Sequence, residues 1–112
     1  MSKRDNRLLL ADIIEATSKI SRYTHELSLE SFLADEKTID AVARNLEIVG
    51  EAYNQLTEEF RANHSVIPWR QLTGLRNRII HEYFGVDLEI IWEIIQNDLK
   101  KLMKDLNEIG GS

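Results

Sequence analysis

Apolar side chains recur at intervals of three and four residues along most of this chain, the spacing that places them on one face of a helix. The first stripe predicts a helix from about Asp5 to His25. Its members are Leu10, Ile13, Ile14, Thr17, Ile20, Thr24 and Leu27. Ser28 to Asp35 breaks the pattern and leaves room for a short helical turn, and Asp35 is a candidate cap for the helix that follows.

A second stripe predicts a long helix that continues to Phe60, before residues 62–65 interrupt it. Its members are Ile39, Val42, Ala43, Leu46, Val49, Tyr53, Leu56 and Phe60. Gly50 lies inside this stripe, although glycine lowers helix propensity. Either a close approach by another helix or simple tolerance would explain its presence.

The third predicted helix begins at Pro68, because proline is accepted in the first turn of a helix, and it ends at about Phe84. The last begins after Asp87, a candidate N-cap, and extends to about Ile109. Its core stripe comprises Leu88, Ile91, Trp92, Ile95, Leu99, Leu102, Leu106 and Ile109.

Ile90 and Ile94 add a second apolar patch to the last helix. We expect them either at a subunit interface or in the core of their own chain. Four helices with short connections and no strand-like alternation predict one all-α domain over residues 1–112, an up-and-down bundle of four main helices, with residues 110–112 as a frayed tail.

The candidate chemistry lies on the third helix, where Arg76 is followed by His81 after four residues and then by Tyr83. On a helical wheel Arg76 falls inside the apolar arc, so its charge needs a carboxylate, a phosphate or a wet cleft to face. His81 lies about 140° away, since each residue turns the helix by about 100°. For the two to act on one bond, either the end of the helix is distorted or two copies meet across a dimer seam, and we expect the dimer. The alternative to a catalytic site is a structural Arg76 in a salt bridge and a solvated His81.

Three stretches of the chain resemble the HEPN family, and within it the HepT type of minimal HEPN toxin. They are Asn45-Leu46-Glu47-Ile48-Val49-Gly50-Glu51-Ala52, Pro68-Trp69-Arg70, and Gly74-Leu75-Arg76-Asn77-Arg78-Ile79-Ile80-His81-Glu82-Tyr83. The resemblance covers nearly the whole chain, with no departure at the Arg, His or Tyr positions. It implies a HEPN-like homodimeric, metal-independent endoribonuclease, the toxin of a type VII toxin-antitoxin pair. It also implies a neighbouring nucleotidyltransferase antitoxin, MntA, that uses ATP to attach AMP to the tyrosine matching Tyr83.

RNA cleavage without a metal needs a base, an acid and positive charge beside the phosphate. His81 suits the proton transfers, and Arg76 can hold two phosphate oxygens. Asn77 could hold the imidazole tautomer or donate to the phosphate, or could be an ordinary surface residue. A nucleotide on Tyr83 would bring phosphate to Arg76 and compete with RNA, although a half-buried structural tyrosine is equally compatible.

The net charge of the chain limits how it could bind RNA. The formal net charge is −5, so an RNA substrate needs a local basic site. Arg70, Arg76 and Arg78 are the candidates near the motif, and the last helix carries a second cluster to which we assign no site: Lys100, Lys101 and Lys104.

Metal ligands and membrane anchors are not indicated by the sequence. There is no cysteine, and the three histidines, His25, His64 and His81, are scattered, so we expect neither a metal nor another cofactor. The charged N-terminus and the interrupted apolar run after it predict neither a signal peptide nor a membrane span, hence a cytoplasmic protein.

Two other function classes stay open. One is a noncatalytic helical partner, or binding module, of a minimal nucleotidyltransferase, which the negative net charge favours slightly. The other is a plain dimeric scaffold. The complete set of Arg76, His81 and Tyr83 favours the ribonuclease.

Overall fold

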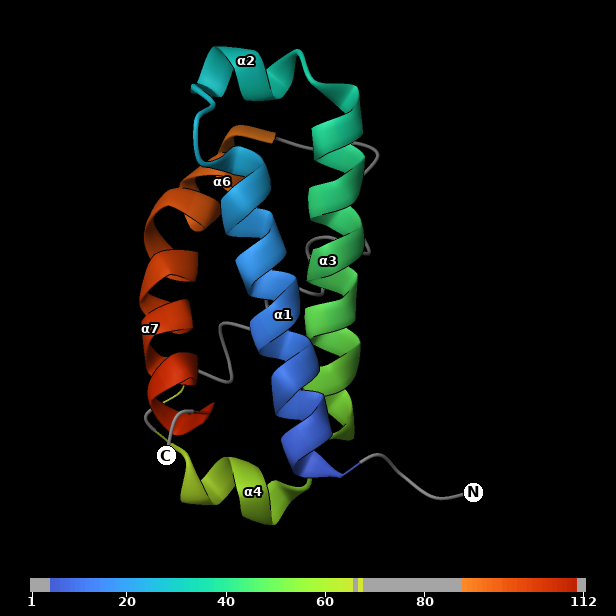
Figure 1. Ribbon diagram of the computed structural model, residues 1–112, viewed down its shortest axis with the longest axis vertical. Helices are drawn as coiled ribbons and strands as arrows, with labels where there is room; N and C mark the ends of the chain where they lie inside the picture. Colours follow the sequence, from blue (N-terminus) through green and yellow to red (C-terminus); the bar gives the residue numbers. More distant parts are fainter. Residues whose placement is uncertain (1–4, 66, 68–87, 111–112) are drawn as a thin grey trace.

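The computed structural model describes residues 5–65, 67 and 88–110, and this part of the chain is helical without a strand. Its elements in chain order are α1 Asn6–Thr24, α2 Leu29–Leu33, α3 Glu36–Gln55, α4 Glu58–Asn63, α6 Leu88–Glu93, the π-helix η2 Ile94–Asp98, and α7 Leu99–Gly110. The long helices α1, α3 and α7 run side by side, and the short helices α2 and α4 lie at opposite ends of the bundle (Figure 1). The all-α prediction is confirmed. The predicted third helix, over residues 68–84, lies outside the described residues.

The first helix agrees with its prediction. The Asp5 carboxylate caps α1 by accepting a hydrogen bond from the Arg7 amide at 2.7 Å, which lowers the pKa of Asp5. The buried face of α1 includes two threonines, whose hydroxyls donate to carbonyls of the same helix. Thr17 donates to the Ile14 carbonyl at 3.0 Å and Thr24 to the Ile20 carbonyl at 2.8 Å. These polar groups can therefore face the core without an unmet hydrogen bond.

The break after α1 contains the short helical turn that the sequence allowed. Ser28 and Ser31 form a reciprocal capping box that begins α2. Phe32 in this helix is fully buried, and its ring centroid lies 5.1 Å from that of Trp92 on α6, tilted by 35°. This aromatic pair attaches α2 to the beginning of the C-terminal helix.

The cap predicted at Asp35 is confirmed. Its carboxylate accepts hydrogen bonds from the Thr38 hydroxyl at 2.7 Å and the Thr38 amide at 3.1 Å, and these two bonds lower the pKa of Asp35. A negative charge at this position also interacts favourably with the positive, N-terminal end of the α3 dipole.

The prediction of one helix through Phe60 is wrong, because α3 ends at Gln55. Leu56 and Thr57 are extended, with ψ angles of 141° and 153°, and Thr57 starts α4 by accepting the Phe60 amide at 3.1 Å. Asn6 on α1 stabilises this corner: its Nδ2 donates to the Thr57 hydroxyl at 3.0 Å, and its Oδ1 accepts the Thr57 amide at 3.2 Å. Phe60 still packs against the core from its own short helix, so the apolar spacing continues across the corner.

The elements α6, η2 and α7 follow one another without a break and together form one long C-terminal helix. The wide turn of η2, with the Leu99 amide bonded to the Ile94 carbonyl, was not predicted. Ile90 and Ile94 are both half-buried, and Ile94 packs against the core of its own chain. Ile94 therefore contributes to the intrachain core, while the subunit interface stays a prediction. Helix α7 runs through Gly110, one residue into the predicted tail.

The core lies where α1, α3 and the C-terminal helix meet. Its most deeply buried aliphatic residues include Leu9, Ile13, Ile20, Val42, Leu46, Val49 and Leu106. Ile67 joins them with 1% of its surface exposed. Helices of this length depend on such burial more than on their intrinsic propensity.

Candidate functional site

The predicted site residues Arg76, Asn77, His81 and Tyr83 all lie within residues 68–87, outside the described part of the chain. Their positions stay predictions. The described residues that flank this segment are attached to the core at both ends. Ile67 is buried and its amide bonds to the His64 carbonyl at 3.1 Å, while Leu88 packs against the core from the first turn of α6.

A corner of packed rings precedes the motif segment. The guanidinium of Arg61 on α4 lies 5.0 Å from the ring centroid of Tyr53 on α3, within the range of a cation–π contact. The rings of Phe60 and His64 lie 4.4 Å apart. The chain therefore reaches Ile67 from a fixed corner of the bundle.

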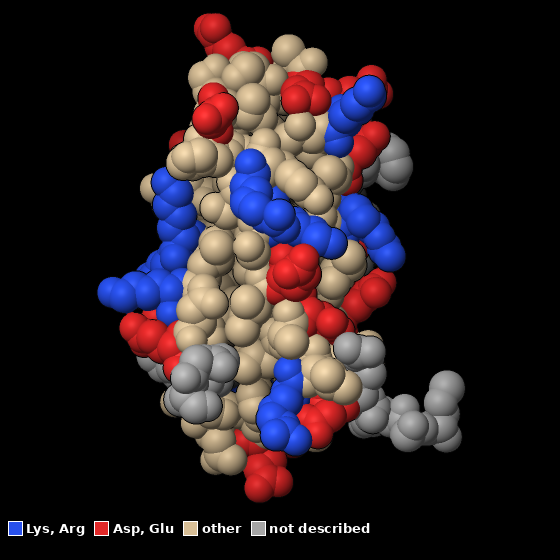
Figure 2. All heavy atoms as spheres, in the orientation of Figure 1, with Lys and Arg blue, Asp and Glu red and all other residues tan. Residues whose placement is uncertain are grey.

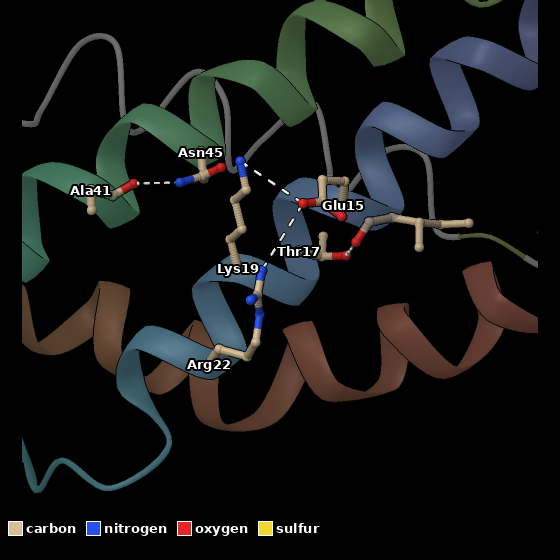
Figure 3. A network of polar contacts seen from close by, with 7 residues as sticks. Glu15, Thr17, Lys19, Arg22, Ala41 and Asn45 are labelled. Carbon is tan, nitrogen blue, oxygen red and sulfur yellow. Dashed lines mark hydrogen bonds and ion pairs between the residues drawn. The ribbon is translucent and has the colours of Figure 1, made fainter.

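The stretch Asn45–Ala52, the first of the three that resemble the family, lies on α3. Asn45 is buried, and its Nδ2 donates to the Ala41 carbonyl one turn earlier at 2.8 Å (Figure 3). Gly50 is also buried, and no glycine in the described residues has a positive φ, so its backbone does not require glycine. The burial of this position is compatible with a close approach by another helix, one of the two explanations that the sequence leaves open.

A carboxylate on α1 faces two cations. Glu15 Oε1 lies 3.9 Å from Lys19 Nζ and 4.0 Å from Arg22 Nη2 (Figure 3). All three side chains are more than one third exposed, so these long pairs add little to stability and their cations can exchange partners.

A polar groove lies between the end of α1 and the C-terminal helix. It is lined by Ser21, Thr24, His25, Ile95, Gln96, Leu99, Lys100 and Met103. Lys and Arg side chains follow both α1 and α7 on the face drawn in Figure 2. The sequence pointed to the lysines of the last helix but not to His25 or Gln96, since their neighbourhood arises only when α1 packs against η2 and α7.

Two further properties concern the described residues only. Across residues 5–65, 67 and 88–110, no helix combines the length and apolar character that crossing a bilayer requires. In the same ranges, no three acidic or histidine side chains lie close enough together to hold a metal ion.

Comparison with known proteins identifies the family. The family described as "Ribonuclease HepT-like" matches residues 13–109. A protein of Thermococcus cleftensis named "Probable ribonuclease HepT" is 42% identical over 100 residues, which cover 89% of this chain and 91% of that protein. "Putative RNase MJ0127" of Methanocaldococcus jannaschii is 40% identical over 109 residues, 97% of this chain and 90% of the relative.

No solved structure is significantly similar to the chain. The assignment therefore rests on the family match and on relatives aligned over nearly their full length. The chain belongs to the HepT-like ribonuclease family.

Proposed function

We propose that this protein is a metal-independent endoribonuclease that acts as a homodimer. The observation that carries the proposal is the family match over residues 13–109, which contains Arg76 and His81. The names of the two relatives support RNA as the substrate class. Of the described residues on either side of the motif, Ile67 is buried in the core and Leu88 packs against it.

The proposed reaction uses the 2′-hydroxyl of the RNA itself as nucleophile. One His81 takes the proton from this hydroxyl as its oxygen bonds to the adjacent phosphorus. The bond from phosphorus to the 5′ oxygen breaks, and the departing oxygen takes a proton from the His81 of the second subunit. Arg76 from both copies holds the nonbridging oxygens, on which negative charge grows in the transition state. Asn77 orients the imidazole or donates to the same phosphate.

A dimer gives this scheme both an acid and a base from one sequence position. In a single regular helix Arg76 and His81 point about 140° apart, since each residue adds about 100°. Two copies facing one another bring an arginine of one subunit toward the histidine of the other. Association into a species of twice the 13.0 kDa chain mass, measured by light scattering, is therefore part of the proposal.

Regulation by nucleotide transfer completes the proposed function. A neighbouring nucleotidyltransferase of the MntA kind would catalyse attack of the Tyr83 phenol oxygen on the α-phosphorus of ATP, with pyrophosphate leaving and the phenol proton passing to a base. Tyr83 lies about 20° from Arg76 on the wheel. The new phosphate would then bind the Arg76 guanidinium that the RNA phosphate needs. The nuclease and the nucleotidyltransferase would thus form a toxin and its antitoxin.

The test compares the wild type with Arg76→Ala and His81→Ala in a bacterial host, with growth and RNA integrity as readouts and EDTA in the assay with purified protein. Arg44→Ala is a matched control, because Arg44 is an exposed arginine on α3 that pairs with Glu47 at 3.5 Å. We expect toxicity and cleavage in the wild type and the control and their loss in the two motif variants. Equal behaviour of all four proteins would reject the nuclease and favour a noncatalytic partner of a nucleotidyltransferase.

The modification has a separate test. The intact mass of protein coexpressed with the neighbouring nucleotidyltransferase should increase by adenylyl units, and Tyr83→Phe should abolish the increase. Adducts that persist in Tyr83→Phe would remove the proposed switch without affecting the nuclease assignment.

A further inference from the structure

The polar groove between α1 and the C-terminal helix has an apolar floor and a rim of hydrogen-bond donors. Ile95 and Leu99 at its base are buried. Its rim carries the Ser21 hydroxyl, the His25 imidazole, the Gln96 amide and the Lys100 ammonium group. These groups can bind an anion without a metal ion.

Lys100 places a positive charge in the lining of this groove, although the chain as a whole carries a net charge of −5. Lys100 and Lys104 are exposed one turn apart on α7, and within the described part of the chain neither has a carboxylate at ion-pair distance. On α1, Lys19 and Arg22 share the Glu15 carboxylate through long exposed contacts and are not among the described residues that line the groove. Figure 2 shows Lys and Arg side chains over both α1 and α7. A phosphate in the groove would therefore meet Lys100, with Lys104 one turn further along α7.

Carboxylates near this surface limit its positive charge. Besides Glu15 on α1, the exposed Glu26 follows the end of that helix beside His25, and α7 carries the half-buried Asp105 beside Lys104 and the exposed Glu108 one turn further on. Glu15 serves two cations at once, so each pair is weak and open to exchange. A nucleic acid brings several phosphates and releases its own counterions when such cations bind.

The π-helix supplies an independent observation. Elements of this type occur mostly as single wide turns and are frequent at functional sites. In this chain η2 occupies residues 94–98 and contributes Ile95 and Gln96 to the groove, and Leu99 and Lys100 follow at once. The distortion of the long helix thus coincides with the hollow and not with an arbitrary part of the surface.

We propose that this groove binds phosphates of a single-stranded RNA backbone and so docks the substrate in addition to the residues that cleave it. The inference rests on the proposed ribonuclease function. The space open to a water-sized group is about 40 Å³, which is enough for a few waters or for the oxygens of a phosphate. Among the described residues of the lining, His25 alone carries an aromatic ring, so this part of the groove offers little platform for stacked bases. Docking is therefore independent of base sequence.

The test measures binding apart from cleavage. A fluorescent ten-nucleotide uridine RNA with 2′-O-methyl groups lacks the proposed nucleophile, so its anisotropy reports binding alone. The groove variant is Lys100→Ala/Lys104→Ala. Its matched control is Lys37→Ala/Arg44→Ala, which removes the same charge from exposed positions on α3.

Each phosphate contact on a single strand contributes about 0.7 to the slope of log affinity against log salt. At about 0.15 M salt this is about a fourfold change in affinity per contact, so losing two lysine contacts weakens binding about fifteenfold and lowers the slope by about 1.4. With a cleavable RNA, the groove variant should raise KM by a similar factor at unchanged kcat. The control should change binding and KM by less than about twofold.

The outcomes separate docking from catalysis. Equal loss of binding in the two double variants would overturn the groove and leave a diffuse electrostatic effect. Saturable binding of inorganic phosphate or AMP by a protein that does not bind the RNA would also overturn it in favour of a small ligand. If the groove variant alone loses RNA binding while the wild type cleaves no RNA, docking stands and the proposed nuclease falls.

Discussion

Replacing Phe32 with alanine tests whether the short helix α2 is part of the core. Phe32 is fully buried, and its ring stacks on Trp92 at the beginning of the C-terminal helix. Removing a buried phenyl ring and leaving a cavity lowers the free energy of unfolding by about 3 to 5 kcal/mol. The lost aromatic pair accounts for about 0.5 to 1.5 kcal/mol of this. Since α2 has five residues and can move toward the space, we take the lower value of about 3 kcal/mol.

The loss can be expressed as a melting temperature. Unfolding entropy of about 2.1 cal/mol/K per residue gives about 0.24 kcal/mol/K for 112 residues, so 3 kcal/mol corresponds to about 13 °C. Circular dichroism melts at one fixed protein concentration measure it, because association shifts Tm by mass action. Leu33→Ala is the matched control, since Leu33 is the next residue of α2 and 40% exposed; it should lower Tm by about 2 °C or less. If the Tm of Phe32→Ala lies within about 4 °C of the Tm of Leu33→Ala, α2 is not part of the core.

Two further predictions concern helix caps. Thr57→Ala should lower the free energy of unfolding, measured by urea titration, by about 1 kcal/mol, because the Phe60 amide and Asn6 both lose a hydrogen-bond partner. Thr57→Ser keeps the hydroxyl and should lower it by less than half as much; equal losses in the two variants would contradict the capping role. For Asp35, whose pKa is lowered by Thr38, the charged carboxylate stabilises the fold fully above its ordinary pKa of 3.8, and this contribution is lost as pH falls through the lowered value. The urea midpoints of the wild type and Asp35→Asn should therefore converge as pH falls from about 5 to 2, and a constant difference over that window would assign the effect of the substitution to something other than the carboxylate charge.

The sequence predicted most reliably what is encoded by neighbouring residues. The stripe of α1 requires only helical periodicity, and the cap predicted at Asp35 requires only one carboxylate ahead of α3. The resemblance to HepT proteins, read from three short stretches, is confirmed by the family match. Membership follows from sequence, whereas the arrangement of Arg76 and His81 stays a prediction.

The features that escaped prediction depend on contacts between distant segments. The end of α3 at Gln55 does not interrupt the apolar spacing, because Leu56 and Phe60 reach the same core from different backbone geometries. The wide turn of η2 leaves the spacing of buried residues almost unchanged, so a periodicity argument does not detect it. The groove needs α1 beside η2, which no local pattern specifies.

The paired hydrogen bonds between Asn6 and Thr57 join residues 51 positions apart in the chain. The Thr57 amide donates to a side chain from the first turn of α1, so its exchange with deuterium requires this hydrogen bond between that turn and the α3–α4 corner to open. Fraying at the start of the protein and opening of this distant bend are thus one local event, and a single amide reports on both.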